Sequence, residues 1–272
     1  MKLLQSLIVA CSMYSKIPMP RIEWNEENMK YAMCFFPVVG VVTGLGVQAV
    51  GTFLLASHFG TLFFAGIMTI LPILISGGIH MDGFMDTMDA RSSYGDREKK
   101  LAILKDSHAG AFAILGLGCY LVLSLALWSE VKREMLPVIS IGFVMSRSMS
   151  GFSVMNFPAA RANGLGRTFQ DAAQRRNTTC VMLLWFAASG AGMLCVSFWM
   201  GGAAILCAAA VFLYYRHVAM KEFGGMTGDL AGYFLVLCEL GMLAGVVLSG
   251  AALAGAALSG AALVGVMPGG GA

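Results

Sequence analysis

Long apolar stretches separated by short polar ones are the feature that most constrains this chain. A helix needs about 20 apolar residues to cross a hydrocarbon core of about 30 Å. Stretches near that length lie at residues 35–56, 62–79, 110–128, 136–155, 180–200, 203–218, 231–249 and 251–268. We therefore predict an all-α fold, a polytopic integral membrane helical bundle with about eight spans and short cytoplasmic loops.

The composition leaves no room for a soluble domain. The chain is 58% hydrophobic and only 12% charged, whereas soluble domains are about 25% charged. We expect a single membrane-embedded domain over residues 1–272. Residues 1–33 would form an N-terminal interfacial segment, and residues 250–272 a low-complexity Gly/Ala tail span, rich in the small residues that pack helices closely.

The distribution of basic residues predicts the orientation. If the N-terminus is inside, all but three of the 18 Lys and Arg fall on one face; the exceptions are Lys132 and Arg133 on the other face and Arg147 within a span. Cytoplasmic loops carry such an excess. We expect a multi-pass protein of the cytoplasmic (inner) membrane with a cytoplasmic N-terminus and cytoplasmic active-site loops. The net charge of +3 then reflects topology and requires no nucleic-acid partner.

Three aspartates follow the second apolar stretch, in "GGIHMDGFMDTMDA". Asp82, Asp86 and Asp89 are spaced i, i+4 and i+7, which places them within about 60° on one helix face. Like charges on successive turns repel and are costly beside hydrocarbon, so the stripe needs a positive partner. Arg or Lys would serve, but aspartates suit Mg²⁺, which usually combines one or two carboxylates with substrate phosphates. The alternative is a solvated helix start beside the membrane.

Two further polar segments carry groups suited to phosphates. In "KDSHAGAFA" Lys105 is a compact cation, and Ser107 and His108 can donate hydrogen bonds. In "PAARANGLGRTF" Arg161 and Arg167 flank a glycine-containing turn. The bias of cytoplasmic loops toward basic residues explains Lys105, Arg161 and Arg167 equally well.

A second double glycine precedes an acid near the end of the chain, in "FGGMTGDLAG". Asp229 would complete the acidic site from this distant segment, or act only as a helix N-cap. Glu239 lies ten residues further on, within a span, where a carboxylate is costly. We expect Glu239 to face the bundle and to pair with Arg147 or another polar group.

In order and spacing, the motifs "FPVVGVVTG", "GGIHMDGFMDTMDA", "ILKDSHAGAFA", "ARANGLG" and "GGMTGDLAG" resemble those of the cobalamin (5′-phosphate) synthase family, the adenosylcobinamide-GDP ribazoletransferases. The resemblance extends from "YSKIPMP" to about residue 245, and the Gly/Ala tail follows no family pattern. It implies a Mg²⁺-dependent membrane enzyme that joins adenosylcobinamide-GDP to α-ribazole or its 5′-phosphate and releases GMP. The lipid bilayer is an expected partner, and a homo-oligomer remains open.

The resemblance also assigns roles to residues. Asp82, Asp86 and Asp89 would be metal ligands and catalytic, with one of them, Asp89 by preference, acting instead as the base on the attacking hydroxyl. Asp229 would be a further ligand or base. The expected substrate-binding side chains are His80, Lys105, Asp106, Ser107, His108, Arg161 and Arg167.

Two other classes of protein remain possible from the sequence. A membrane phosphotransferase of the CDP-alcohol type also places spaced aspartates at a helix mouth, but its signature has an Ala-Arg after Asp-Gly and a four-aspartate spacing that "DGFMDTMDA" lacks. A transporter would use Arg147 and Glu239 for coupling. It would be expected to show broken helices in matching halves.

Overall fold

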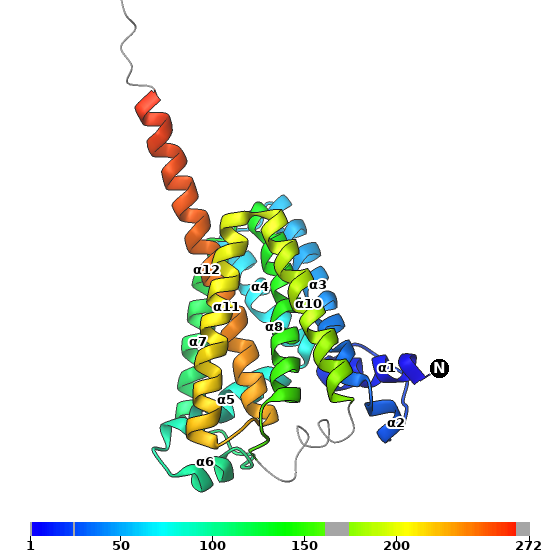
Figure 1. Ribbon diagram of the computed structural model, residues 1–272. Helices are drawn as coiled ribbons and strands as arrows, with labels where there is room; N and C mark the ends of the chain where they lie inside the picture. Colours follow the sequence, from blue (N-terminus) through cyan, green and yellow to red (C-terminus); the bar gives the residue numbers. More distant parts are fainter. Residues whose placement is uncertain (1, 24, 161–173, 265–272) are drawn as a thin grey trace, which may run out of the picture.

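The computed structural model describes residues 2–23, 25–160 and 174–264, and in these residues the protein is a bundle of long helices (Figure 1). This confirms the predicted all-α membrane fold. The α-helices are α1 (Lys2–Tyr14), α2 (Glu26–Met29), α3 (Phe36–Ala56), α4 (Thr61–Ser76), α5 (Ile79–Ser92), α6 (Arg97–Ile103), α7 (Ala111–Ser129), α8 (Leu136–Asn156), α10 (Arg175–Val196), α11 (Phe198–Val218) and α12 (Gly228–Val264).

The number of spans is smaller than the eight expected. In the described part of the chain six helices are long and apolar enough to cross a membrane, or seven if the bent pair α4 and α5 is counted as one span. The difference arises at the C-terminus, where residues 231–249 and 251–268 were predicted as two spans. The helix runs through the junction between these stretches without a break and continues to Val264.

Helix α12 is therefore longer than a membrane is thick. Its 37 residues extend about 55 Å at 1.5 Å per residue, against a hydrocarbon core of about 30 Å. Figure 1 shows its C-terminal part projecting beyond the ends of the neighbouring helices. The Gly/Ala segment up to Val264 thus continues α12 and is not a separate span.

Helix α8 forms the centre of the bundle, with α3, α10 and α12 packed around it. In the 18-residue apolar stretch of the span that contains α8, 83% of the residues are buried. The corresponding stretches of the other five candidate spans are 17–50% buried. The outer helices instead expose large apolar side chains such as Leu62, Leu184 and Leu206. Such an apolar periphery suits contact with lipid.

A buried ion pair joins α8 to α12. Arg147 Nη1 lies 2.7 Å from Glu239 Oε1, and Ser146 Oγ donates to the same oxygen over 2.9 Å. The Arg147 side chain is 1% exposed. The predicted pairing of Glu239 with Arg147 is confirmed. The attraction between the two charges offsets the free-energy cost of removing them from water.

A double glycine turns the chain sharply between α4 and α5. Gly77 (φ 67°) ends α4 and Gly78 (φ 82°) precedes α5, both in the left-handed region that side chains disfavour. The two helices meet at 97°. We take α4 as the spanning segment and α5 as a helix outside it, lying at the end of the bundle.

That end of the bundle also holds the other short polar elements. Figure 1 shows α1, α2, α5 and α6 gathered at its lower end, where α8 and α11 finish and α12 begins. The opposite end holds the tight connections between α3 and α4, α7 and α8, and α10 and α11, and the projecting C-terminal part of α12 (Figure 1). The short polar elements of the described chain are therefore concentrated at one end.

This arrangement predicts the outcome of reporter fusions. A fusion at residue 95, in the polar end, should give the cytoplasmic signal because this end carries the Lys and Arg excess. Fusions at residue 132 and at residue 58 should both give the opposite signal. Equal signals at residues 95 and 132 would contradict the topology.

Candidate functional site

The site is built where α5 crosses α12. An ideal Cβ added to Gly83 would lie only 2.7 Å from the carbonyl oxygen of Asp229, and one added to Gly232 would lie 3.0 Å from the carbonyl oxygen of His80. The first distance is too short for a Cβ, and the second would require a small shift of the neighbouring backbone. The two glycines therefore allow the backbones to touch, and the stacked rings of Phe84 and Tyr233, 5.7 Å apart, continue the contact.

This crossing brings four carboxylates together. Burial, followed by the nearby charges of Asp82, Asp229 and Asp89, raises the pKa of Asp86 to about 6. The predicted acidic stripe on α5 is thus confirmed as one face of a helix, and Asp229 joins it from the distant second motif. Asp229 is not the N-cap of α12, because Thr227 Oγ1 accepts the hydrogen bond from the Leu230 N–H over 3.2 Å.

Asp89 connects the stripe to the start of α7. Its carboxylate lies against Gly110, the residue before α7, so closely that a Cβ at Gly110 would collide with it. Gly110 follows directly on the "KDSH" segment, where Asp106 Oδ1 accepts from His108 Nδ1 over 2.7 Å. The side chains in this segment are exposed to solvent. They are Lys105, Asp106, Ser107 and His108.

Among the described residues, no Lys or Arg forms an ion pair with Asp82, Asp86 or Asp89. Nor does any group of three or more His, Cys, Asp or Glu in the described ranges have the geometry to hold a metal ion by itself. The donor set fits a hard cation that takes one or two carboxylates and fills its other positions with water and phosphate oxygens.

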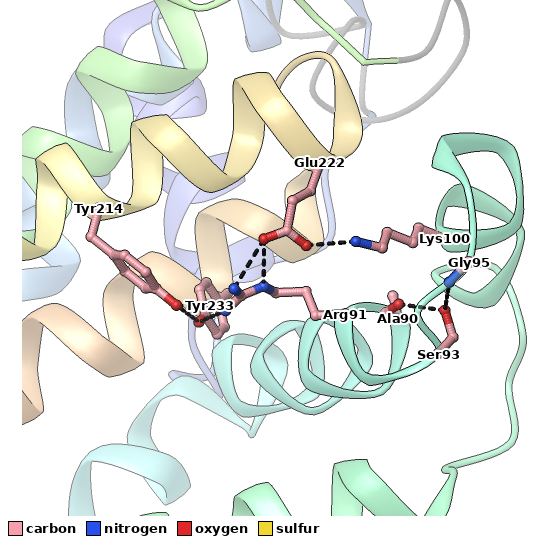
Figure 2. A network of polar contacts seen from close by, with 8 residues as sticks. All are labelled: Ala90, Arg91, Ser93, Gly95, Lys100, Tyr214, Glu222 and Tyr233. Carbon is pink, nitrogen blue, oxygen red and sulfur yellow. Dashed lines mark hydrogen bonds and ion pairs between the residues drawn. The ribbon is translucent and has the colours of Figure 1, made fainter.

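A polar network fixes the far end of α5 (Figure 2). Arg91 lies between the Glu222 carboxylate, 2.9 Å away, and the hydroxyls of Tyr214 and Tyr233, to which it donates over 2.6 and 2.8 Å. Lys100 Nζ binds the other Glu222 oxygen over 2.6 Å. These contacts tie α5 and α6 to α11, α12 and the short π-helix Ala219–Phe223.

A cavity of about 290 Å³ opens beside the carboxylates. Asp82 and Asp229 line it together with residues of α1, α3, α5, α8 and α12, among them Tyr14, Phe36 and His80. Burial, and then the charge of Arg147, lowers the pKa of His80 to about 3. The imidazole is therefore neutral, and the substrate-binding role predicted for His80 would be that of a hydrogen-bonding group.

Sequence reasoning missed the network and the cavity. Arg91 and Lys100 were counted only as basic residues of a cytoplasmic loop, although the lone acid Glu222, just before the second double glycine, was a signal for a pairing partner. The cavity had no signal, since its lining comes from five helices. Arg161 and Arg167, predicted to bind phosphates, lie outside the described residues.

Comparisons with known proteins agree with the motifs. The family described as Cobalamin-5-phosphate synthase matches residues 6–247. Three similar proteins, all named adenosylcobinamide-GDP ribazoletransferase, come from Lachnoclostridium phytofermentans (47% identical, over 92% of this chain and 95% of that protein), Desulfitobacterium hafniense (31%, 89% and 96%) and Pseudomonas fluorescens (32%, 82% and 91%). No solved structure matches the chain.

The crossing of α5 and α12 predicts a difference between two glycine substitutions. Gly83→Ala should lower the free energy of unfolding by about 1–3 kcal/mol, because the new methyl group overpacks the contact with Asp229. Gly118→Ala, in α7, is the matched control. A Cβ at Gly118 meets nothing within 4 Å, so alanine should be neutral or stabilise by up to about 1 kcal/mol. Thermal unfolding in detergent measures both, and equal midpoints would contradict the close crossing.

Proposed function

Because the chain belongs to the cobalamin-5-phosphate synthase family, we propose that it is a Mg²⁺-dependent adenosylcobinamide-GDP ribazoletransferase of the cytoplasmic membrane. It transfers the cobinamide-phosphate group of adenosylcobinamide-GDP to α-ribazole or α-ribazole 5′-phosphate and releases GMP. This is the step that assembles the nucleotide loop of cobalamin. Family membership favours this activity over a CDP-alcohol phosphotransferase or a transporter.

One observation supports the assignment of the site most strongly. The acidic stripe on α5 and Asp229 on α12 are about 140 residues apart in the sequence, yet their charges interact. Asp82 of the stripe and Asp229 line one cavity, and α5 and the start of α12 lie at the polar end of the bundle (Figure 1). A membrane transferase with one bulky and one small substrate needs such an open, charged mouth.

The reaction proceeds by attack of a ribazole hydroxyl on the phosphorus that carries the cobinamide. A new P–O bond forms to the ribazole oxygen, the P–O bond to GMP breaks, and the hydroxyl proton passes to a carboxylate. Asp229, which lines the cavity beside Asp82, would join the metal site as a further ligand or accept that proton. Transfers of this kind depend on positioning and charge neutralisation more than on covalent help from the protein.

Asp82, Asp86 and Asp89 would hold the metal, which neutralises charge on the pyrophosphate oxygens when bound. The contact of Asp89 with Gly110 places the "KDSH" segment beside that end of the stripe. Lys105, Ser107 and His108 are exposed there and would bind phosphate oxygens of the substrate. Arg161 and Arg167 are assigned the same role from the sequence.

Substitution of the stripe tests the assignment. Asp82→Asn, Asp86→Asn and Asp89→Asn should each lower kcat for GMP release at least about 100-fold, a loss of about 2.7 kcal/mol of transition-state stabilisation. Each change removes a ligand charge at nearly constant volume. The assay uses purified protein in detergent with adenosylcobinamide-GDP, α-ribazole and Mg²⁺.

Asp96→Asn is the matched control for this series. Asp96 caps α6 by accepting from the Lys99 N–H over 2.9 Å, and asparagine caps about as well as aspartate. Activity should therefore be retained. A stripe variant with near-normal kcat at saturating Mg²⁺ would exclude that aspartate from the metal site.

Asp229 tests whether the two motifs act as one site. Asp229→Asn should lower kcat and weaken the Mg²⁺ dependence together. The double variant Asp86→Asn/Asp229→Asn should lose much less than the two single losses added, because residues that act as a unit are not additive. If Asp229 contributed only a first-turn charge to α12, asparagine would cost about 0.3–1 kcal/mol in stability. Full activity of Asp229→Asn would refute the shared site.

A further inference from the structure

The cavity behind the carboxylates has two buried polar atoms with no hydrogen-bond partner. Within the described part of the chain, His80 Nε2 and Ser150 Oγ are unpaired. The residues are only 8% and 1% exposed, and both line the cavity. An unpaired buried donor or acceptor costs about 1–3 kcal/mol, so the cavity is suited to a ligand that hydrogen-bonds at this depth.

The remaining walls favour a flat apolar group. Tyr14 and Phe36 line the cavity with ring centroids 4.3 Å apart, and the His80 ring lies 6.4 Å from Tyr14 and 6.0 Å from Phe36. Leu235 and methionine side chains complete the lining. Mostly apolar walls with a few placed polar groups are typical of small-molecule pockets, which begin at about 300 Å³.

We propose that this cavity binds the heterocyclic base of the ribazole, an inference that rests on the proposed function. That base is a benzimidazole, a flat and largely apolar bicycle with one unsubstituted ring nitrogen. The nitrogen accepts a hydrogen bond, and the imidazole of His80 or the hydroxyl of Ser150 can donate one. The ring itself packs against Tyr14 and Phe36.

The other parts of the two substrates fit less well. The corrin ring with its amide side chains is several times larger than 290 Å³. The guanine base carries donors and acceptors on most of its edges, whereas most of the residues that line the cavity are apolar. A lipid chain would leave His80 Nε2 and Ser150 Oγ unpaired.

The position of the cavity agrees with the orientation that the acceptor substrate needs for the reaction. Asp82 and Asp229 line the same cavity as His80 and Ser150, and the ribose of a bound ribazole extends from its base. With the base inside, the ribose hydroxyls lie toward the carboxylates. The cavity therefore orients the acceptor, and the pyrophosphate approaches from the open polar end.

Steady-state kinetics with two variants tests the proposal. His80→Leu and Ser150→Ala should raise the KM for α-ribazole roughly five- to tenfold in at least one case, while the KM for adenosylcobinamide-GDP stays unchanged. Ser148→Ala is the matched control on α8. Its hydroxyl donates to the Met145 carbonyl over 2.7 Å, and Ser148 does not line this cavity, so both KM values should be unchanged.

An altered substrate sharpens the test. An α-ribazole analogue with C–H in place of the unsubstituted ring nitrogen should show a raised KM with the unmodified protein. In the variant that loses the hydrogen bond, the analogue and α-ribazole should have the same KM, as a double-substitution cycle requires. The test compares the KM values of two ligands on the same variant. A smaller fraction of folded protein therefore does not change the comparison.

The outcomes separate the two proposals. If the unmodified protein releases GMP but both variants keep the KM for α-ribazole, or raise only the KM for adenosylcobinamide-GDP, the cavity assignment is wrong and the proposed function stands. If the unmodified protein releases no GMP with α-ribazole or its 5′-phosphate at saturating Mg²⁺, the proposed function is refuted, and the cavity assignment with it.

Discussion

The backbone contact between α5 and α12 is the constraint on which the rest of the site depends. Gly83 and Gly232 allow this contact, because a Cβ at either position would lie within about 3 Å of the opposite backbone. The contact holds Asp229 against the helix that carries the acidic stripe. Arg91 then fixes the distal end of α5 through Glu222, Tyr214 and Tyr233. The backbone contact between α5 and α12 and the polar network around Arg91 thus hold together a site made from two motifs that are distant in the sequence.

Charge pairing elsewhere accounts for the absence of an ion pair between the stripe and Arg91, Lys100 or Arg147. Arg91 and Lys100 are both engaged by Glu222, and Arg147 is engaged by Glu239. These three cations are therefore held by other acids. Carboxylates that repel one another are stabilised by a nearby positive charge, and the proposed divalent ion would supply it.

Much of the fold and the acidic stripe could be predicted from the sequence, because both depend on local pattern. Apolar stretches of spanning length predicted the long helices, and the i, i+4, i+7 spacing predicted the stripe. The cost of an unpaired charge within a span predicted the pairing of Arg147 with Glu239. The C-terminal span count was wrong because the alanine-rich stretch continues α12 without a break.

The cavity, the Arg91 network and the crossing of α5 and α12 could not be predicted in the same way. Each depends on residues far apart in the chain that no period connects. Gly83 illustrates the limit: only the structure identifies the backbone of Asp229 as the neighbour that its missing side chain admits. The same holds for Ser150, one serine among several on α8 until the cavity gives it a role.

Metal binding tests most directly whether α5 and α12 form one carboxylate site. Mn²⁺ is a spectroscopic substitute for Mg²⁺ at oxygen ligands, and bound Mn²⁺ can be counted by electron paramagnetic resonance on purified protein with adenosylcobinamide-GDP present. We predict bound Mn²⁺ for the unmodified protein and for Asp96→Asn, and its loss in Asp86→Asn and in Asp229→Asn. Equal Mn²⁺ binding by all four proteins would contradict the account.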